Sequence, residues 1–181
     1  MNILGLTNML SKAKFVISKP QLIALLLYVQ GPKGQIGEEV VGKTRLMKLV
    51  FLLLKEVGLE ENISDDSSFE PYKYGPFDSD VYDSIDALKE LHVVKENPAE
   101  KREMKEDEDE DEDESYDANT TFKLSDFGIS KVKELVERTP REVVDKIVKV
   151  KTIYGGMPLV ELLHYVYSKH PDYARLSEAK I

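Results

Sequence analysis

The chain contains 181 residues, has a formal net charge of -9 and lacks cysteine. This length suits one domain with a short appendage, and the lack of cysteine excludes disulfides, thiolate catalysis and cysteine-based zinc sites. The longest apolar run is residues 22–29, whereas a membrane helix needs about 18 apolar residues. Residues 1–19 contain no contiguous signal-peptide core. We therefore predict a globular cytoplasmic protein that makes no membrane contact.

The negative charge is concentrated in one acidic segment. Residues 106–114 read EDEDEDEDE and hold nine of the 34 acids, so the remaining 25 are balanced by 25 Lys and Arg. Like charges repel each other and bury no apolar surface, which predicts a disordered insertion at residues 105–117. Such a loop either serves solubility alone or covers a basic surface of a partner. Both interpretations stay open.

Hydrophobic periodicity predicts two helices in the first third of the chain. Residues 21–30 are rich in Leu and Ala, which favours a buried helix, and Pro20 is well tolerated at its start. The second helix is predicted to begin at an N-cap on Thr44 and to end before Gly58. Its apolar residues recur at helical spacing: Leu46, Met47, Val50, Leu53, Leu54 and Val57.

A Gly-Pro corner separates a short extended stretch, residues 69–74, from a third helix. Pro76 keeps Gly75 out of helical geometry, and Asp78 is placed to accept hydrogen bonds from the first free amides of the helix. Asp78 and Asp80 also lie where the positive end of the helix dipole favours them, a structural role that needs no substrate. The predicted buried face comprises Val81, Ile85, Leu88 and Leu91.

The second half of the chain predicts a hairpin and three helices. Residues 93–96 and 120–124 are expected to pair, with the acidic segment at the hairpin tip. Ser125 or Asp126 then caps a helix whose inward residues are Ile129, Val132, Leu135 and Val136. TPRE at 139–142 is typical of a capping box with Pro at the first helical position, and that helix runs to residues 155–156. The last helix lies between Pro158 and His170.

This order of elements is that of a winged helix. We expect a mainly α protein with a small β-hairpin, in which residues 1–138 form a winged-helix-like domain. Residues 139–181 form a C-terminal helical extension that packs on this domain or on a second subunit. The last helix carries a wide apolar stripe, which predicts a homodimer through the C-terminal helices: Leu159, Leu162, Leu163, Val166 and Tyr167.

Residues 37–44, GEEVVGKT, satisfy the phosphate-binding P-loop pattern. That loop requires a buried strand ending at its first Gly, and here the nearest apolar run ends at Val29. Glu38 and Glu39 would also place negative charge beside the phosphates, and no later apolar run ends in an Asp that could hold magnesium. We predict that the match is a coincidence and that no cofactor is bound; a nucleotide-binding protein is the less favoured alternative.

No other pattern in the sequence predicts catalysis. His92, His164 and His170 lack metal-ligand spacing, and the G-x-S-x-G elbow is absent. Asp78, Asp80 and Asp83 form a candidate carboxylate site, but capping and dipole effects account for the first two. We therefore predict no catalytic residue, no metal site and no enzyme activity.

Several stretches carry a family resemblance. RLMKLVFLLL at 45–54, FEPYKYGPF at 69–77, VYDSIDALKELHVV at 81–94 and LSDFG at 124–128 resemble the Panacea, or SocA-like antitoxin, family and its small YwgA-type winged-helix relatives. PLVELLHYVYSKHPDYARLS at 158–177 is similar to the tail of such proteins. The Tyr-Gly-Pro-Phe corner is the most specific element. The resemblance implies a winged-helix domain with a role in protein or DNA contacts, often as the antitoxin of a toxin-antitoxin pair, and implies no enzyme activity. The acidic insertion departs from the family pattern.

Two functions follow from these expectations. The preferred one is an antitoxin-like or adaptor module that binds a protein partner, with the acidic loop facing basic surface. The alternative is a DNA-binding transcription regulator in which residues 80–91 enter the major groove, but this helix is acidic, and its net charge opposes DNA binding. The candidate interaction residues lie on the second, third and fifth helices: Lys43, Arg45, Lys48, Asp80, Asp83, Ser84, Lys89, Arg141, Lys149 and Lys151.

Overall fold

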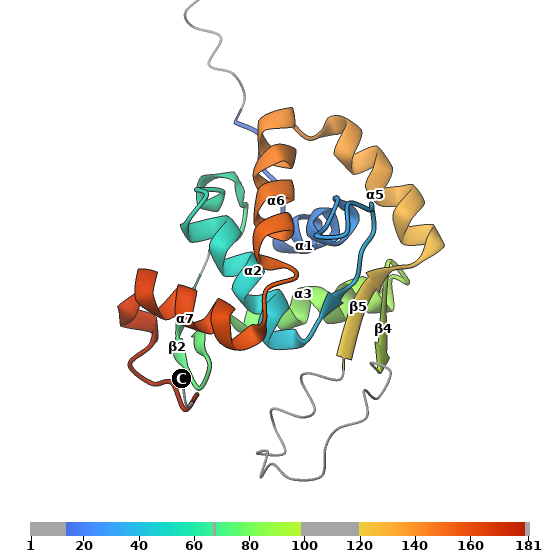
Figure 1. Ribbon diagram of the computed structural model, residues 1–181. Coiled ribbons are helices and arrows are strands. Elements are labelled where there is room, and N and C mark those ends of the chain that lie inside the picture. The colour runs from blue at the N-terminus through green and yellow to red at the C-terminus, as the bar shows by residue number, and fades with distance from the viewer. Residues whose placement is uncertain (1–13, 67, 99–119, 180–181) are drawn as a thin grey trace, which may run out of the picture.

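The computed structural model describes residues 14–66, 68–98 and 120–179 and shows a mainly helical protein with a small β component (Figure 1). This architecture confirms the predicted fold class. The acidic insertion predicted at 105–117 lies outside the described residues. The α-helices are α1 Lys19–Tyr28, α2 Lys43–Lys55, α3 Ser79–Glu90, α5 Asp126–Arg138, α6 Arg141–Tyr154 and α7 Leu159–Lys169, and short 3-10 helices occupy Glu60–Asn62 and Pro171–Tyr173.

The strands form a three-stranded antiparallel sheet and a separate hairpin. The sheet has the order β1–β5–β4, with β1 at Val40–Val41, β4 at Val94–Pro98 and β5 at Thr120–Leu124. The hairpin joins β2, Glu70–Tyr72, to β3, Gly75–Phe77. The predicted pairing of residues 93–96 with 120–124 is confirmed. Strand β1 was not predicted, because two residues are too few to show alternation.

The order of the described elements follows the predicted one, with α3 directly before the β4–β5 pair. Helix α1, strand β1, helices α2 and α3 and strands β4 and β5 follow one another along the chain, and the β2–β3 hairpin is inserted before α3. Strand β5 lies between β1 and β4 and pairs Phe122 with Val40 and Leu124 with Val94. The described sheet therefore has the strand order of a winged helix.

Helices α1 and α2 form the centre of the molecule. Leu22 to Leu27 of α1 and Leu46 to Leu54 of α2 are all buried, so neither helix keeps a polar face over these residues. Helices α3, α5 and α6 contact α1, while α6 and α7 contact α2, as Figure 1 shows for the surrounding helices. The fold is therefore one core enclosed by helices from both halves of the chain.

The C-terminal helices pack on the preceding helices and strands of their own chain. Leu162, Leu163 and Val166 of α7 are buried, and α7 contacts α2 and β3. The apolar stripe that suggested pairing through the C-terminal helices is thus largely covered within the chain. Residues 139–179 belong to the same packed body as the helices before them.

Four local predictions are wrong. Helix α2 begins at Lys43 after Gly42 rather than after an N-cap on Thr44, because strand β1 extends to Val41. TPRE forms no capping box, since Pro140 is the N-cap residue and the Thr139 hydroxyl donates to the Leu135 carbonyl, 2.8 Å away.

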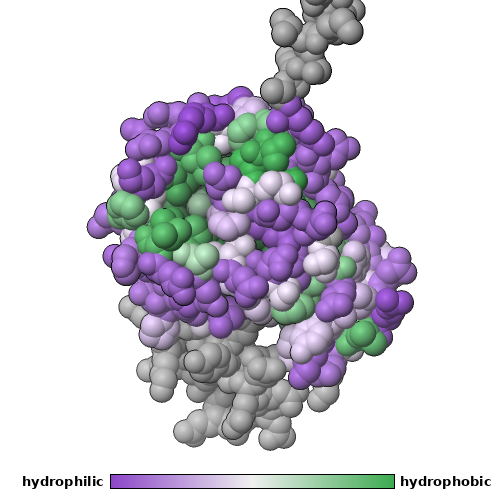
Figure 2. All heavy atoms as spheres, turned by 180° about the vertical axis from the view of Figure 1, so that it is seen from behind, coloured by the Kyte–Doolittle hydropathy of each residue, from purple (hydrophilic) through white to green (hydrophobic). Residues whose placement is uncertain are grey.

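The other two errors concern apolar residues that were expected to face inward. Leu91 is 66% exposed because α3 ends at Glu90, and Ile129 on α5 is 40% exposed. Figure 2, which views the molecule from behind, shows apolar side chains gathered on the side where α5 lies. This face therefore carries apolar surface that the sequence pattern assigned to the core.

Candidate interaction surface

The Gly-Pro corner before α3 is fixed by contacts from two other helices. Gly75 has a φ of +87°, a conformation that favours glycine. A Cβ atom on Gly75 would lie 2.6 Å from Cε1 of Tyr167 on α7, so the backbone there approaches the ring closely. From α2, the buried Lys48 donates a hydrogen bond through Nζ to the Pro76 carbonyl at 3.0 Å. The corner is thus held between α2 and α7.

A buried ammonium group holds the start of α3 against the start of α1. Lys19 Nζ lies 2.8 Å from Asp78 Oδ2 and 2.9 Å from Asp80 Oδ2, and it donates to the Asp66 carbonyl at 3.0 Å. Burial alone would lower the pKa of Lys19, but the hydrogen bonds and charges of Asp78 and Asp80 raise it above its ordinary value. Asp78 also accepts from the Asp80 amide, which confirms the predicted N-cap.

The position of Lys19 in the sequence is a signal that could have predicted this ion pair. Lys19 opens α1, where the helix dipole disfavours a positive charge, and α1 has no acid in its first turn. A lysine at such a position requires carboxylates from elsewhere in the chain when it is buried. The sequence analysis predicted a capping role for Asp78, a favourable position at the helix dipole for both Asp78 and Asp80, and a possible interaction role for Asp80. It did not predict a role for Lys19.

The exposed side of α3 is acidic and ends in an apolar residue. Asp83, Asp86 and Glu90 are exposed on this helix, and Leu91 follows them directly. Lys89, the basic residue of the last turn, forms ion pairs with Asp86 at 3.0 Å and with Glu96 of β4. The surface of α3 that solvent reaches is therefore dominated by carboxylates.

Three of the candidate interaction residues lie inside the protein. Lys48 donates to the corner, and the Ser84 hydroxyl donates to the Asp80 carbonyl at 2.6 Å. Lys151 of α6 donates to three carbonyls, those of Leu27 at 3.0 Å, Val29 at 2.9 Å and Glu38 at 2.8 Å. Burial lowers the pKa of Lys151 to about 8. All three side chains are buried; those of Lys48 and Lys151 hold separate elements of the fold together, whereas that of Ser84 bonds within α3.

The remaining basic candidates are separated from one another. Arg45 is half-buried and donates to the carbonyls of Val41 at 3.1 Å and Tyr154 at 3.4 Å and to that of Met157, and burial lowers its pKa. Lys43 lies 4.0 Å from Glu96, Arg141 lies 2.8 Å from Asp145, and Lys149 is exposed on α6. Arg45 thus has a structural role, and the surface cations occur on two helices among carboxylates.

Residues 37–44 do not have the geometry of a phosphate-binding loop. Val40 and Val41 form strand β1 inside the motif, and the Gly42 amide donates to the Thr120 carbonyl at 2.7 Å. The Glu38 carboxylate accepts hydrogen bonds from the amides of Lys33 and Gln35. Backbone amides that would have to cradle phosphate oxygens are thus engaged in the sheet, which agrees with a coincidental sequence match.

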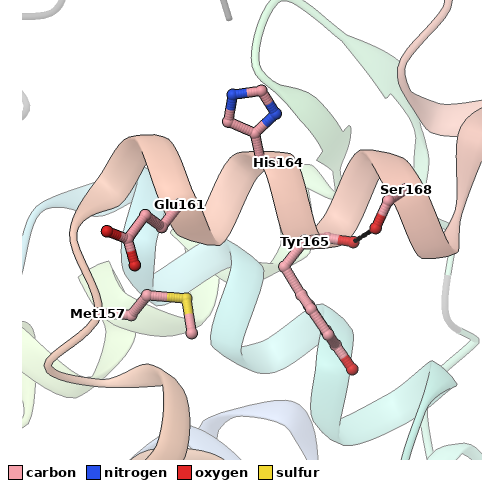
Figure 3. Close-up of a pocket in the computed structure, with 5 residues that line it drawn as sticks. All are labelled: Met157, Glu161, His164, Tyr165 and Ser168. Atoms are coloured by element: carbon pink, nitrogen blue, oxygen red, sulfur yellow. Dashed lines mark hydrogen bonds between the residues drawn. The ribbon is translucent and has the colours of Figure 1, made fainter.

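A pocket of ≈ 460 Å³ lies along α7, lined by Met157, Glu161, His164, Tyr165 and Ser168. Figure 3 shows that His164 and Tyr165 point to different sides of the helix, and the Ser168 hydroxyl donates to the Tyr165 carbonyl at 2.9 Å. The Tyr165 hydroxyl donates outside this set, to Glu56 Oε1 at 2.6 Å. The lining side chains do not converge on one point, so this pocket presents no nucleophile and base in contact.

The described residues contain no group of three or more His, Asp or Glu side chains that could hold a metal ion. Within the same ranges, no helix has the length and apolar character needed to cross a membrane. The three histidines lie apart: His92 is exposed after α3, His164 is exposed on α7, and His170 packs against Phe51.

Comparison with protein-family models found no match to this chain, and comparison with curated proteins found none either. The resemblance to the Panacea family therefore stays a prediction, carried by the residues quoted above.

Proposed function

We propose that this chain is a non-enzymatic interaction module on a winged-helix scaffold, antitoxin-like or adaptor in role. In this proposal the exposed side of α3 binds a basic surface of a protein partner. The observation that carries it is the row of exposed carboxylates, Asp83, Asp86 and Glu90, which ends beside the exposed Leu91. Carboxylates steer a basic partner and set its orientation, and an adjacent apolar residue adds contact area.

The attachment of α3 supports this proposal, because a rigid surface loses less conformational entropy on binding. Lys19 and Asp78 fix the first turn of the helix through a buried ion pair. At the other end, the Ser125 hydroxyl donates to the His92 carbonyl at 2.6 Å, and the Ser125 amide donates to Val93 at 2.9 Å. The carboxylates of α3 are thus presented from a helix that is held at both ends.

DNA binding is the alternative, and the charges of α3 argue against it. Nucleic-acid affinity depends on neutralising phosphates with Lys and Arg, and direct readout of the major groove relies mainly on Arg, Lys, Asn and Gln. Helix α3 carries Lys89 as its basic residue, and Asp86 and Glu96 already neutralise it. A DNA-binding mode would have to use another face, such as the exposed Arg141 and Lys149 of α6.

A charge-reversal experiment tests the protein-binding proposal. The test variant, Asp83→Lys combined with Glu90→Lys, replaces two exposed carboxylates of α3 with ammonium groups. The control variant, Glu142→Lys combined with Glu161→Lys, makes the same change in net charge on α6 and α7. Proteins captured from native lysate by the wild type and by the control, but lost with the α3 variant, would support the proposal. Equal capture by all three, with each variant folded by circular dichroism, would contradict it.

A further inference from the structure

Helix α5 is the least covered α-helix in the described part of the chain. Only Gly128 and Val132 of its 13 residues are buried. Ile129 remains 40% exposed, and Leu135 and Val136 are half-buried. A helix of this length depends on packing of its apolar side more than on intrinsic propensity. Helix α5 thus keeps apolar surface that the rest of the described chain does not cover.

The charged residues on one flank of α5 are paired within the helix, although the Phe127 side chain there is 51% exposed. Residues three and four apart lie on the same side, which groups Phe127, Lys131 and Glu134. Lys131 Nζ lies 5.9 Å from the centroid of the Phe127 ring and 3.8 Å from Glu134 Oε1. These contacts combine a cation–π interaction with an ion pair and leave no unpaired charge among the three.

The opposite flank combines apolar residues with unpaired charges of both signs. It contains Ile129, Lys133 and Val136, at spacings of four and three, with Glu137 beside them. No ion pair joins Lys133 or Glu137 to another residue of the described ranges, whereas Lys131 and Glu134 are paired. Figure 2 shows apolar side chains gathered on the side of the molecule where α5 lies.

We infer that a second copy of this chain covers this flank, with its own α5 running antiparallel. A twofold axis near Leu135 places Lys133 of each copy opposite Glu137 of the other. The same axis brings the two Val136 side chains close together and sets each Ile129 near the turn between α5 and α6 of the other copy. A twofold interface must be complementary to itself. A flank that carries a cation toward one end and an anion toward the other meets that condition, because each charge then lies opposite the unlike charge of the second copy.

This pairing is independent of the α3 surface and replaces the expected dimer through the C-terminal helices, whose apolar stripe is largely covered within the chain. One helix pair is smaller than a standard interface, so the dissociation constant should be on the order of 10 µM or weaker. Sedimentation velocity from about 5 to about 500 µM should therefore show a reversible monomer–dimer equilibrium.

Matched substitutions locate the interface. Ile129→Arg should weaken dimerisation at least about tenfold by placing an uncompensated charge in the contact, whereas Phe127→Arg on the opposite flank should leave it unchanged. Lys133→Glu should also weaken the dimer, and adding Glu137→Lys should restore it, because the pair is then reversed in both copies. An unchanged dimer in Ile129→Arg, or a monomer throughout the wild-type series, would overturn the inference.

The lack of cysteine permits a second, direct readout. Val136→Cys lies close to the proposed twofold axis and should form a disulfide-linked dimer under mild oxidation. Phe127→Cys is the control and should form such a dimer much more slowly. Equal rates for the two variants would contradict the antiparallel pairing. Because both experiments use the purified protein alone, their outcome is separate from that of the partner-binding test on α3.

Discussion

Lys19 Nζ and Asp78 Oδ2 form a buried ion pair at 2.8 Å although 59 residues separate them in the chain. The pair joins the first turn of α1, in the core, to the first turn of α3, whose far side is acidic and exposed. It therefore connects the packing of the scaffold to the position of the surface that we propose for partner binding.

Removing one member of this pair should destabilise the protein strongly. Asp78→Ala deletes the N-cap of α3 and removes the buried carboxylate beside the Lys19 ammonium, leaving the half-exposed Asp80 as its ion-pair partner within the described residues. We therefore expect a loss of about 3–5 kcal/mol in the free energy of unfolding. Asp80→Ala is the matched control and should cost much less, since the Asp80 side chain is 52% exposed. Urea unfolding measures both, and equal small losses would contradict the assigned role of the pair.

Gly75 should tolerate no side chain. Gly75→Val combines a φ of +87° with a Cβ atom directed at the Tyr167 ring, so a loss of about 3 kcal/mol or more is expected. Gly58→Val is the control, because Gly58 also has positive φ but an added Cβ would meet no atom within 4 Å. Thermal unfolding should rank Gly75→Val clearly below Gly58→Val. Equal melting temperatures would show that contact with Tyr167 does not restrict the corner.

The buried Lys151 predicts a specific dependence of stability on pH. Burial lowers its pKa in the folded state to about 8 from an ordinary value of 10.5, so the unfolded chain binds more protons between these two values. The stability of the wild type relative to Lys151→Met should therefore rise as pH increases from about 8 to 10.5. Chemical unfolding of both proteins across this range provides the measurement. A difference that stays constant or falls would contradict the lowered pKa.

Replacing His170 with phenylalanine should stabilise the protein. Its Nε2 atom is buried and has no hydrogen-bond partner within the described ranges, and its ring packs edge-on against Phe51 with centroids 4.9 Å apart. His170→Phe removes an unsatisfied polar atom from an aromatic cluster and should stabilise the protein by about 1 kcal/mol. His164→Phe, at an exposed position, should change little. A lower melting temperature for His170→Phe would mean that the imidazole makes a contact that phenylalanine lacks.

The parts of this fold that depend on local chemistry could be predicted from the sequence. The Asp78 and Ser125 caps and the Gly-Pro corner follow from neighbouring residues, and the pairing of β4 with β5 follows from the order of two short strands along the chain. Helical spacing wrongly predicted that Leu91 is buried. Periodicity shows which side of a helix a residue lies on, but it does not show where the helix ends or how far the packed elements around it extend.

The features that could not be predicted from the sequence depend on tertiary contacts. The roles of Lys19, Lys48 and Lys151 depend on carboxylates and carbonyls far away in the chain. Lysine is rarely buried, so sequence reasoning placed Lys48 and Lys151 on the surface among the candidate interaction residues. The acidic character of α3 was readable from its sequence, whereas its rigid attachment at both ends was not.

The proposal that α3 serves a protein partner can be checked by measuring the binding of duplex DNA to the purified protein at low and physiological salt. We expect no measurable binding by the wild type. Asp83→Lys combined with Glu90→Lys should gain only weak affinity that is independent of sequence and disappears as salt rises. Tight binding of one DNA sequence by the wild type, weakened by alanine at Asp83 and Glu90, would contradict the proposal that α3 serves a protein partner.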